Sequence, residues 1–90
     1  MTRPRQLAED AFASEGLQPA TWSNEGGYVY GEHLHAYHKV LFCISGSVTF
    51  HTPDGDLRLE PGSRLDLPAG TPHAATVGPE GVVCMEAPRP

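Results

Sequence analysis

Histidine is the residue type in this sequence with the clearest chemistry, and three of its five copies lie within six positions. His33 and His35 are two residues apart, so on a β-strand both imidazole rings project from the same face. Two adjacent imidazoles can occupy neighbouring corners of the coordination sphere of a divalent metal ion. His73 follows a stiff turn at residues 68–72, which would hold its approach angle. We therefore expect His73 to add a third imidazole from a distant strand.

The other two histidines are expected to face solvent. Tyr37 and Lys39 share the inward parity of the histidine pair, so His38 between them should point outward. His51 alternates with apolar neighbours and precedes a turn, so it should also be exposed.

The elements that must position these residues are mostly strands, because apolar residues recur with a period of two from residue 20 onward. Gly46 is expected to break one strand, and residues 53–55, 61–63 and 78–81 read as turns. Seven or eight short strands without a second helix predict an all-β antiparallel barrel or sandwich. The expected strands span residues 21–23, 28–32, 40–45, 48–50, 57–59, 65–67, 73–77 and 82–86.

A single helix is expected before the strands. Thr2 is a candidate cap, Pro4 fits the first turn, and Gly16 fits a left-handed stop. We expect this helix to cover an end or an edge of the sheet. Its apolar face comprises Leu7, Ala8, Ala11 and Phe12.

Composition and charge exclude several classes of protein. The chain of 90 residues fits one domain, and its net charge of −5 with only six basic residues provides no nucleic-acid-binding stripe. The longest apolar run, residues 40–44, is far too short to span a membrane. No apolar signal core precedes it, so we expect a cytoplasmic protein in which Cys43 and Cys84 are free, buried thiols.

The spacing around the histidine pair resembles the first motif of the cupins. That motif is glycine, five residues, His-x-His, three or four residues, glutamate, six residues and glycine. Here the chain reads Gly27, five residues, His33-Leu34-His35, three residues, Lys39, six residues and Gly46. Lysine therefore stands where the cupins usually carry a carboxylate ligand.

The second cupin motif also has a counterpart. It reads glycine, five residues, Pro-x-Gly, two residues, histidine, three residues and asparagine. Here the chain reads Gly62, five residues, Pro68-Ala69-Gly70, two residues, His73, three residues and Val77. The two motifs in order imply a small antiparallel jelly-roll, or double-stranded β-helix, barrel with one short N-terminal helix. We expect a single cupin-like domain over residues 1–90, with a helical segment at 1–18 and the barrel at 20–87.

Lys39 leaves three hypotheses open, because a protonated ammonium has no lone pair for a metal. In the first, three imidazoles (His33, His35 and His73) hold the metal, and Lys39 weakens the site, loses its proton or turns away. In the second, His38 takes the vacant corner through a local bulge. In the third, no metal binds, and the histidines with Lys39 bind an anion directly.

Strand parity also predicts the surroundings of the site. Lys39, Tyr37, Leu41 and Cys43 should face inward with the histidines. The aromatic candidates for the pocket mouth are Trp22, Tyr28, Tyr30 and Tyr37. Neither Glu32 nor Asp66 has inward parity, so no other carboxylate is expected in the pocket. Outward-facing Val40, Phe42 and Ile44 would form an apolar patch, which predicts a homodimer unless the N-terminal helix covers it.

The resemblance implies a range of functions, since cupins include dioxygenases, isomerases, decarboxylases and sugar-binding regulators. The favoured hypothesis is a protein that holds Zn, Fe, Ni or Mn at His33, His35 and His73 and acts on or binds a small, oxygen-rich, anionic organic molecule. Lys39 and Tyr37 are then the candidate catalytic residues, as a substrate-pairing or basic group and an orienting hydroxyl. The alternatives are a non-enzymatic sensor or carrier with a weak or absent metal site, and a structural dimer with a vestigial pocket.

Overall fold

Two long strands form the centre of the fold. In this computed structural model, which describes residues 2–90, β3 (His38–Thr52) and β6 (His73–Arg89) pair antiparallel along most of their length. The shorter elements are α1 (Pro4–Ser14), β1 (Ala20–Asn24), β2 (Val29–His33), β4 (Gly55–Leu59) and β5 (Arg64–Leu67).

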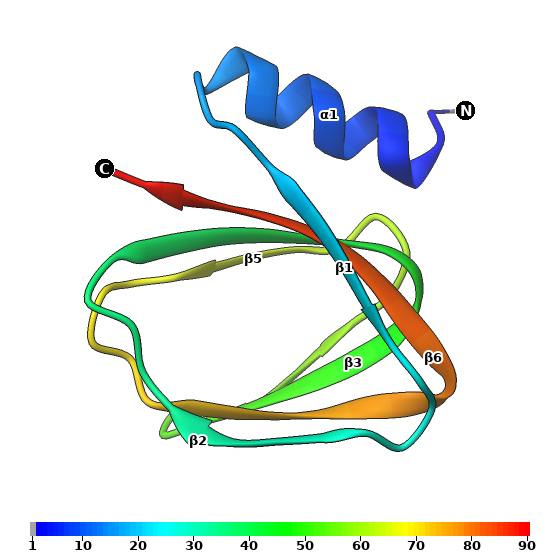
Figure 1. Cartoon of the computed structure of the whole chain (residues 1–90), viewed down its shortest axis with the longest axis vertical. Coiled ribbons are helices and arrows are strands. Elements are labelled where there is room, and N and C mark those ends of the chain that lie inside the picture. The colour runs from blue at the N-terminus through cyan, green and yellow to red at the C-terminus, as the bar shows by residue number, and fades with distance from the viewer. Residues whose placement is uncertain (1) are drawn as a thin grey trace.

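The shorter strands extend this central pair on both sides. β1 and β2 pair with successive parts of β6, and β5 and β4 pair with successive parts of β3, all antiparallel. Because both long strands bend, the sheet curls around an interior (Figure 1). The prediction of an all-β antiparallel barrel with one short N-terminal helix is confirmed.

Gly46 does not end a strand, contrary to expectation. β3 continues through Gly46, and its register with β6 shifts between Cys43 and Ser45 and again between Gly46 and Val48. The expected turn at residues 78–81 likewise lies inside β6. The two glycine-containing stretches meet, since Gly46 pairs with Val82, so both strands bend at the same place and remain paired. Residues 2–90 therefore form six strands, two of them long and bent, in place of seven or eight short ones.

The alternation of β3 follows the predicted parity. Leu41 and Cys43 lie in the barrel interior, whereas Val40 and Phe42 lie in a second cluster on the outside. Cys43 is the register partner of Cys84, and both are buried free thiols, as expected. The interior cluster is completed by Val48, Phe50, Leu59, Leu67, Ala75, Val77 and Val82.

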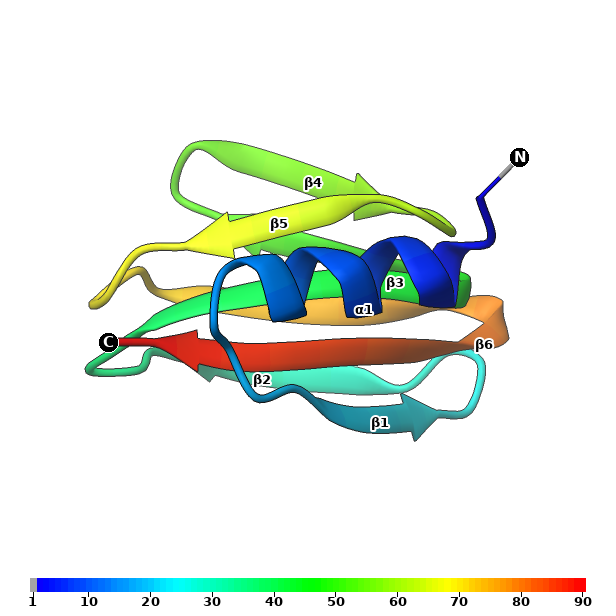
Figure 2. The same ribbon diagram turned by 90° about the horizontal axis from the view of Figure 1, so that it is seen from above.

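α1 covers the outer apolar stripe of β3 and β6. Phe12 packs edge-to-face against Phe42, with 5.4 Å between the ring centroids, and Val40 is fully buried (Figure 2). The helix thus covers a face of the sheet, not an end or edge, because its buried residues pack against the outward-facing apolar residues of the two long strands. With the stripe covered within one chain, it no longer gives a reason to expect a homodimer.

The ends of α1 match the prediction in part. Gly16 adopts φ +70°, and Leu17 donates to the carbonyl of Phe12, which is the glycine-terminated helix end that was expected. The N-cap is Arg3 with no side-chain cap bond, so the assignment of Thr2 as the cap was wrong. Pro4 supplies a preset backbone angle at the first turn in its place. No helix within residues 2–90 is both long and apolar enough to cross a membrane.

A carboxylate–arginine cluster ties the end of α1 to the sheet, and we expect it to make stability pH-dependent. Arg64 donates to Glu15 and, from Nε at 2.7 Å, to Asp66, which lowers the pKa of both carboxyls below their ordinary values of 4.5 and 3.8. The ion pairs stabilise the fold fully at a pH above the ordinary pKa values of the two carboxyls. This stabilisation is lost as the pH falls from those values through the lower pKa values of the folded protein. Arg64→Gln should therefore be less stable than the wild type at neutral pH, and the difference should shrink at about pH 3. Urea unfolding of the variant and the wild type at neutral pH and at about pH 3 measures this difference in stability.

Arg58→Gln is the matched control, because Arg58 pairs with Glu60 at 3.5 Å on an exposed part of the sheet. Its stability should stay within about 0.5 kcal/mol of the wild type at both pH values. An Arg64→Gln deficit that is equally large at about pH 3 would contradict the linkage.

Candidate metal centre

Three imidazoles converge from two segments that are forty positions apart. His33 ends β2, His73 begins β6, and the two are register partners, while His35 lies just beyond β2. The nearest ligand atoms of the three rings all lie within 4.8 Å of one another. The ring centroids are 4.3 Å apart for His33 and His73, and 5.2 Å apart for His35 and His73. The convergence was expected, although His35 reaches the cluster from a loop and not from the regular strand.

Backbone contacts orient two of these rings toward a shared centre. Nδ1 of His33 lies 2.8 Å from the carbonyl of Gly31, and Nδ1 of His73 lies 2.9 Å from the carbonyl of Thr71. Since a carbonyl only accepts, each Nδ1 carries the hydrogen and leaves the lone pair on Nε2. Nε2 of His73 is buried without a hydrogen-bond partner in the described chain. The donor set therefore fits a divalent metal ion, because the orphaned nitrogen has the lone pair that such an ion requires.

Burial keeps the imidazoles in the protonation state that metal binding needs. Desolvation is the main cause that lowers the pKa of both His35 and His73 below the ordinary value of 6.5. The Lys39 ammonium lowers the pKa of His35 further. Both rings are thus neutral at pH 7, which is the form that coordinates metals.

The loop before His73 connects the two histidine segments. The backbone N–H of Gly70 donates to the carbonyl of His35 at 2.8 Å, and the hydroxyl of Thr71 donates to Pro68 at 2.8 Å. These bonds hold the 68–72 loop against the His35 segment, which gives the predicted stiff turn its role in positioning His73.

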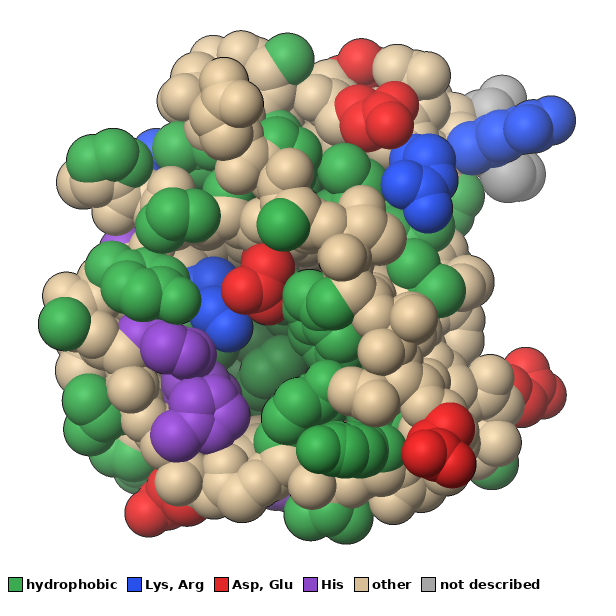
Figure 3. Space-filling model, in the orientation of Figure 1, with side chains coloured by type: hydrophobic (Ala, Val, Ile, Leu, Met, Phe, Trp, Pro, Cys, Tyr) green, Lys and Arg blue, Asp and Glu red, His purple; other side chains and the backbone are tan. Residues whose placement is uncertain are grey.

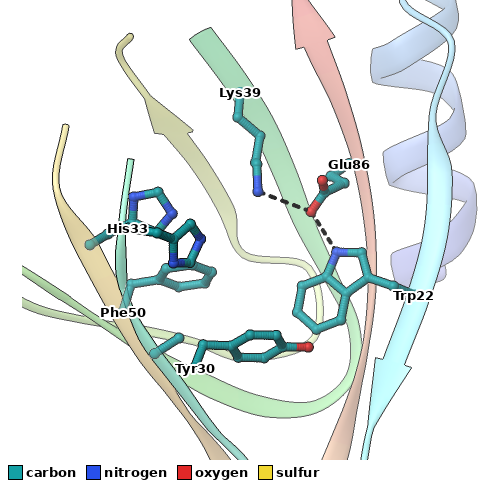
Figure 4. A pocket seen from close by; sticks show the side chains of 8 residues that line it. Trp22, Tyr30, His33, Lys39, Phe50 and Glu86 are labelled. Carbon is teal, nitrogen blue, oxygen red and sulfur yellow. Dashed lines mark hydrogen bonds and ion pairs between the residues drawn. The ribbon is translucent and has the colours of Figure 1, made fainter. Parts of the chain in front are cut away.

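A cavity of about 240 Å³ opens beside the cluster. Figure 3 shows histidine side chains at one rim of this hollow, a basic and an acidic side chain next to them along the same rim, and hydrophobic side chains opposite. Aromatic side chains form much of the wall, and Figure 4 shows Tyr30 and Phe50 beneath the polar groups. The lining residues are Trp22, Tyr30, His33, Lys39, Phe50, His73, Ala75 and Glu86.

Lys39 lies in the cavity wall as parity predicts, but it is paired there with a carboxylate that was not expected. Its ammonium is 3.4 Å from Oε1 of Glu86, and the same oxygen accepts a 2.6 Å hydrogen bond from the indole N–H of Trp22 (Figure 4). The expectation that no other carboxylate enters the pocket was wrong. A signal was present, because Glu86 has the same strand parity as Cys84, which was assigned to the core.

The remaining candidates lie outside the cavity lining. Nε2 of His38 bonds Asp66 at 3.2 Å on the outer face, so His38 does not occupy the vacant corner beside the three imidazoles. His51 bridges Asp56 and Thr76 and is only partly exposed. Tyr37 is 43% exposed and lies beside the His35 ring, with 5.0 Å between centroids, at the outside of the cluster. It is therefore not an inward-facing wall residue.

The fold and site define a small β-barrel whose mouth carries three convergent imidazoles. The Cupin domain family matches residues 21–86, which is most of the chain. The chain therefore belongs to the cupin family, and the resemblance carried by its two motifs is confirmed.

The matches to individual proteins cover only part of the length of those proteins. Quercetin 2,3-dioxygenase of Bacillus subtilis strain 168 is 36% identical over 44 residues, which are 48% of this chain and 13% of that protein. A chain from crystal structures of DMSP lyases superposes with a TM-score of 0.76 at 31% identity, covering 82% of this chain and 38% of that one. A cupin-2 domain protein from Shewanella frigidimarina NCIMB 400 superposes with a TM-score of 0.69 at 24% identity. That match covers 81% of this chain and 71% of the other. The chain thus spans well under half of the dioxygenase and the lyase.

Proposed function

We propose that this cupin holds a divalent metal ion at His33, His35 and His73 and uses it to bind or transform a small, oxygen-rich, anionic organic molecule. The observation that carries the proposal is the buried, unpartnered Nε2 of His73 beside two further imidazoles. When bound, such an ion supplies Lewis acidity toward a ligand oxygen. Three imidazoles suit Zn, Fe, Ni and Mn, so the donor set does not choose among them.

The charges around the cluster favour an anionic ligand. Neutral imidazoles do not offset the double positive charge of the ion, and no carboxylate joins the three histidines within ligand distance in residues 2–90. The opposite charges of Lys39 and Glu86, 3.4 Å apart, cancel each other. The metal end of the cavity would thus carry the excess positive charge, which attracts a carboxylate or enolate oxygen.

Lys39 and Tyr37 are the proposed catalytic residues. The Lys39 ammonium lines the cavity and can donate to a ligand oxygen or hold a proton there. The Tyr37 hydroxyl can contact a ligand only from the mouth, beside His35. Similarity to a quercetin 2,3-dioxygenase and to DMSP lyases supports an enzyme, although each match covers less than half of the relative.

A second candidate is a non-enzymatic sensor or carrier that binds an anion with little or no metal. It is favoured by the lysine at the position of the usual carboxylate, since an ammonium repels a nearby metal ion. A cytoplasmic location and a homodimer stay predictions from the sequence, although the apolar stripe that suggested the homodimer is covered by α1.

Metal content tests the proposal. Protein purified without a histidine tag and dialysed against about 1 equivalent of Zn²⁺, Fe²⁺, Ni²⁺ or Mn²⁺ should retain about 1 ion per chain by elemental analysis. His73→Ala should lose that ion, because it removes the buried donor, whereas His51→Ala on the outer face should retain it. Equal retention by both variants, or none by the wild type after reconstitution, would contradict the metal site and favour the anion-binding candidate.

A further inference from the structure

Lys39, Glu86 and Trp22 form a polar subsite in the cavity wall, at strand positions separate from the three imidazoles. We propose that this subsite binds a hydroxyl group on a ring-shaped ligand whose anionic end lies at the histidines; this inference rests on the proposed function. The subsite combines a buried lysine, 8% exposed, with a carboxylate that is fixed by the indole N–H (Figure 4).

The hydrogen-bonding capacity of the pair matches a hydroxyl. Oε1 of Glu86 is used by Trp22 and Lys39, which leaves Oε2 as an acceptor. The ammonium carries three hydrogens, and within residues 2–90 Glu86 is its only ion-pair partner. A hydroxyl can accept from the ammonium and donate to the free carboxylate oxygen at once, so it satisfies both groups.

Charged groups fit this position poorly. A ligand carboxylate facing Lys39 would also face Glu86, and a ligand ammonium facing Glu86 would also face Lys39. Because the Lys39–Glu86 pair carries no net charge, it selects a ligand group by the pattern of its hydrogen-bond donors and acceptors. It does not select a group by its charge. The anionic part of the ligand therefore belongs at the metal end, and the neutral polar part belongs here.

The walls of the cavity favour a ring between these two ends. Trp22 and Tyr30 meet edge-to-face, with 5.7 Å between centroids, and Asn24 donates to the Tyr30 hydroxyl, which holds that ring in place. Phe50 lines the same cavity and is 5% exposed. Rigid aromatic walls bind the apolar faces of rings well, both the flat face of an aromatic ring and the puckered face of a saturated one.

The test compares ligands that differ only by a hydroxyl. Isothermal titration calorimetry with apo and Zn²⁺-loaded protein measures benzoate, meta-hydroxybenzoate and para-hydroxybenzoate, and the corresponding cyclohexanecarboxylates identify which kind of ring the walls prefer. At least one hydroxylated ligand should bind about tenfold more tightly than its parent. In Lys39→Met/Glu86→Met that advantage should fall to within about twofold.

The matched control is Arg58→Met/Glu60→Met, which removes an exposed cation–carboxylate pair at 3.5 Å outside the cavity. It should keep the hydroxyl advantage in full. A hydroxyl advantage that survives in Lys39→Met/Glu86→Met, or its absence in the wild type for every isomer and both ring types, would overturn the inference. A protein that holds no zinc but keeps a Lys39- and Glu86-dependent hydroxyl advantage would support the subsite and refute the metal function alone.

Discussion

Lys39→Glu should raise the affinity of the three-histidine cluster for a divalent metal ion by about 100-fold or more. As a scale, a unit charge about 5 to 6 Å from any doubly charged ion, with an effective dielectric constant of about 20, has an interaction energy of about 6 kcal/mol with that ion. Alongside the larger effect of desolvation, Lys39 is close enough to the cluster for its charge to lower the pKa of both His35 and His73. Replacing an ammonium by a carboxylate reverses the sign of this interaction. We expect the realised gain to be much smaller than the full Coulomb energy, because Glu86 already compensates Lys39 and solvent relaxes around the pair.

Comparing several Lys39 variants separates the loss of the positive charge from the gain of a carboxylate. Lys39→Met removes the repulsion without adding a ligand, so its metal affinity should lie between that of the wild type and that of Lys39→Glu. In Lys39→Glu the new carboxylate stands near Glu86, so the apo protein should be destabilised and the metal should restore its stability. Adding Glu86→Gln removes the like-charge contact and should stabilise the apo form while metal affinity stays high.

Competition with a chromophoric chelator measures these affinities, and thermal unfolding with and without metal measures the stabilities. A wild type that binds metal as tightly as Lys39→Glu would contradict the prediction, because it would mean that the lysine has no electrostatic effect on the cluster. If catalytic turnover or ligand affinity falls in Lys39→Glu despite tighter metal binding, Lys39 acts on the ligand, as proposed.

The convergence of the histidines could be predicted from sequence because it depends on short-range rules. The spacing of His33 and His35, and the stiff loop before His73, each restrict local geometry. The order of the two motifs then identified the family in which such segments meet. Strand parity likewise placed Leu41 and Cys43 inside, since alternation holds along any regular strand.

Glu86 and Gly46 were misread because their roles depend on contacts between distant segments. Glu86 follows an apolar run and resembles the polar end of a strand, and only its contacts with Lys39 and Trp22 give its Oε1 atom partners in the cavity wall. Gly46 resembles a strand end in the sequence, and only the opposing bend in β6 turns it into a bulge within a continuous strand. Strand parity gave a local signal for the inward position of Glu86. Neither its contacts with Lys39 and Trp22 nor the opposing bend in β6 has a local signature in a single sequence.

Gly46→Ala should lower the free energy of unfolding by more than about 3 kcal/mol, for two reasons that add. Gly46 adopts φ +71°, a left-handed conformation that costs an L-residue about 1–2 kcal/mol. A Cβ at this position would also lie 1.9 Å from the backbone oxygen of Gly81, which belongs to the paired strand and cannot rotate away. The two long strands must therefore separate at their common bend.

Gly62→Ala carries the first cause alone, so comparing it with Gly46→Ala isolates the clash with Gly81. Gly62 also has a positive φ, +92°, but a Cβ there meets no atom within 4 Å, so only conformational strain of about 1–2 kcal/mol is expected. Urea unfolding followed by circular dichroism should show Gly46→Ala to be less stable than Gly62→Ala by about 2 kcal/mol. Equal losses in the two variants would mean that β3 and β6 can part at the bend without cost, and the close approach of Gly46 and Gly81 would then not be what holds the barrel closed.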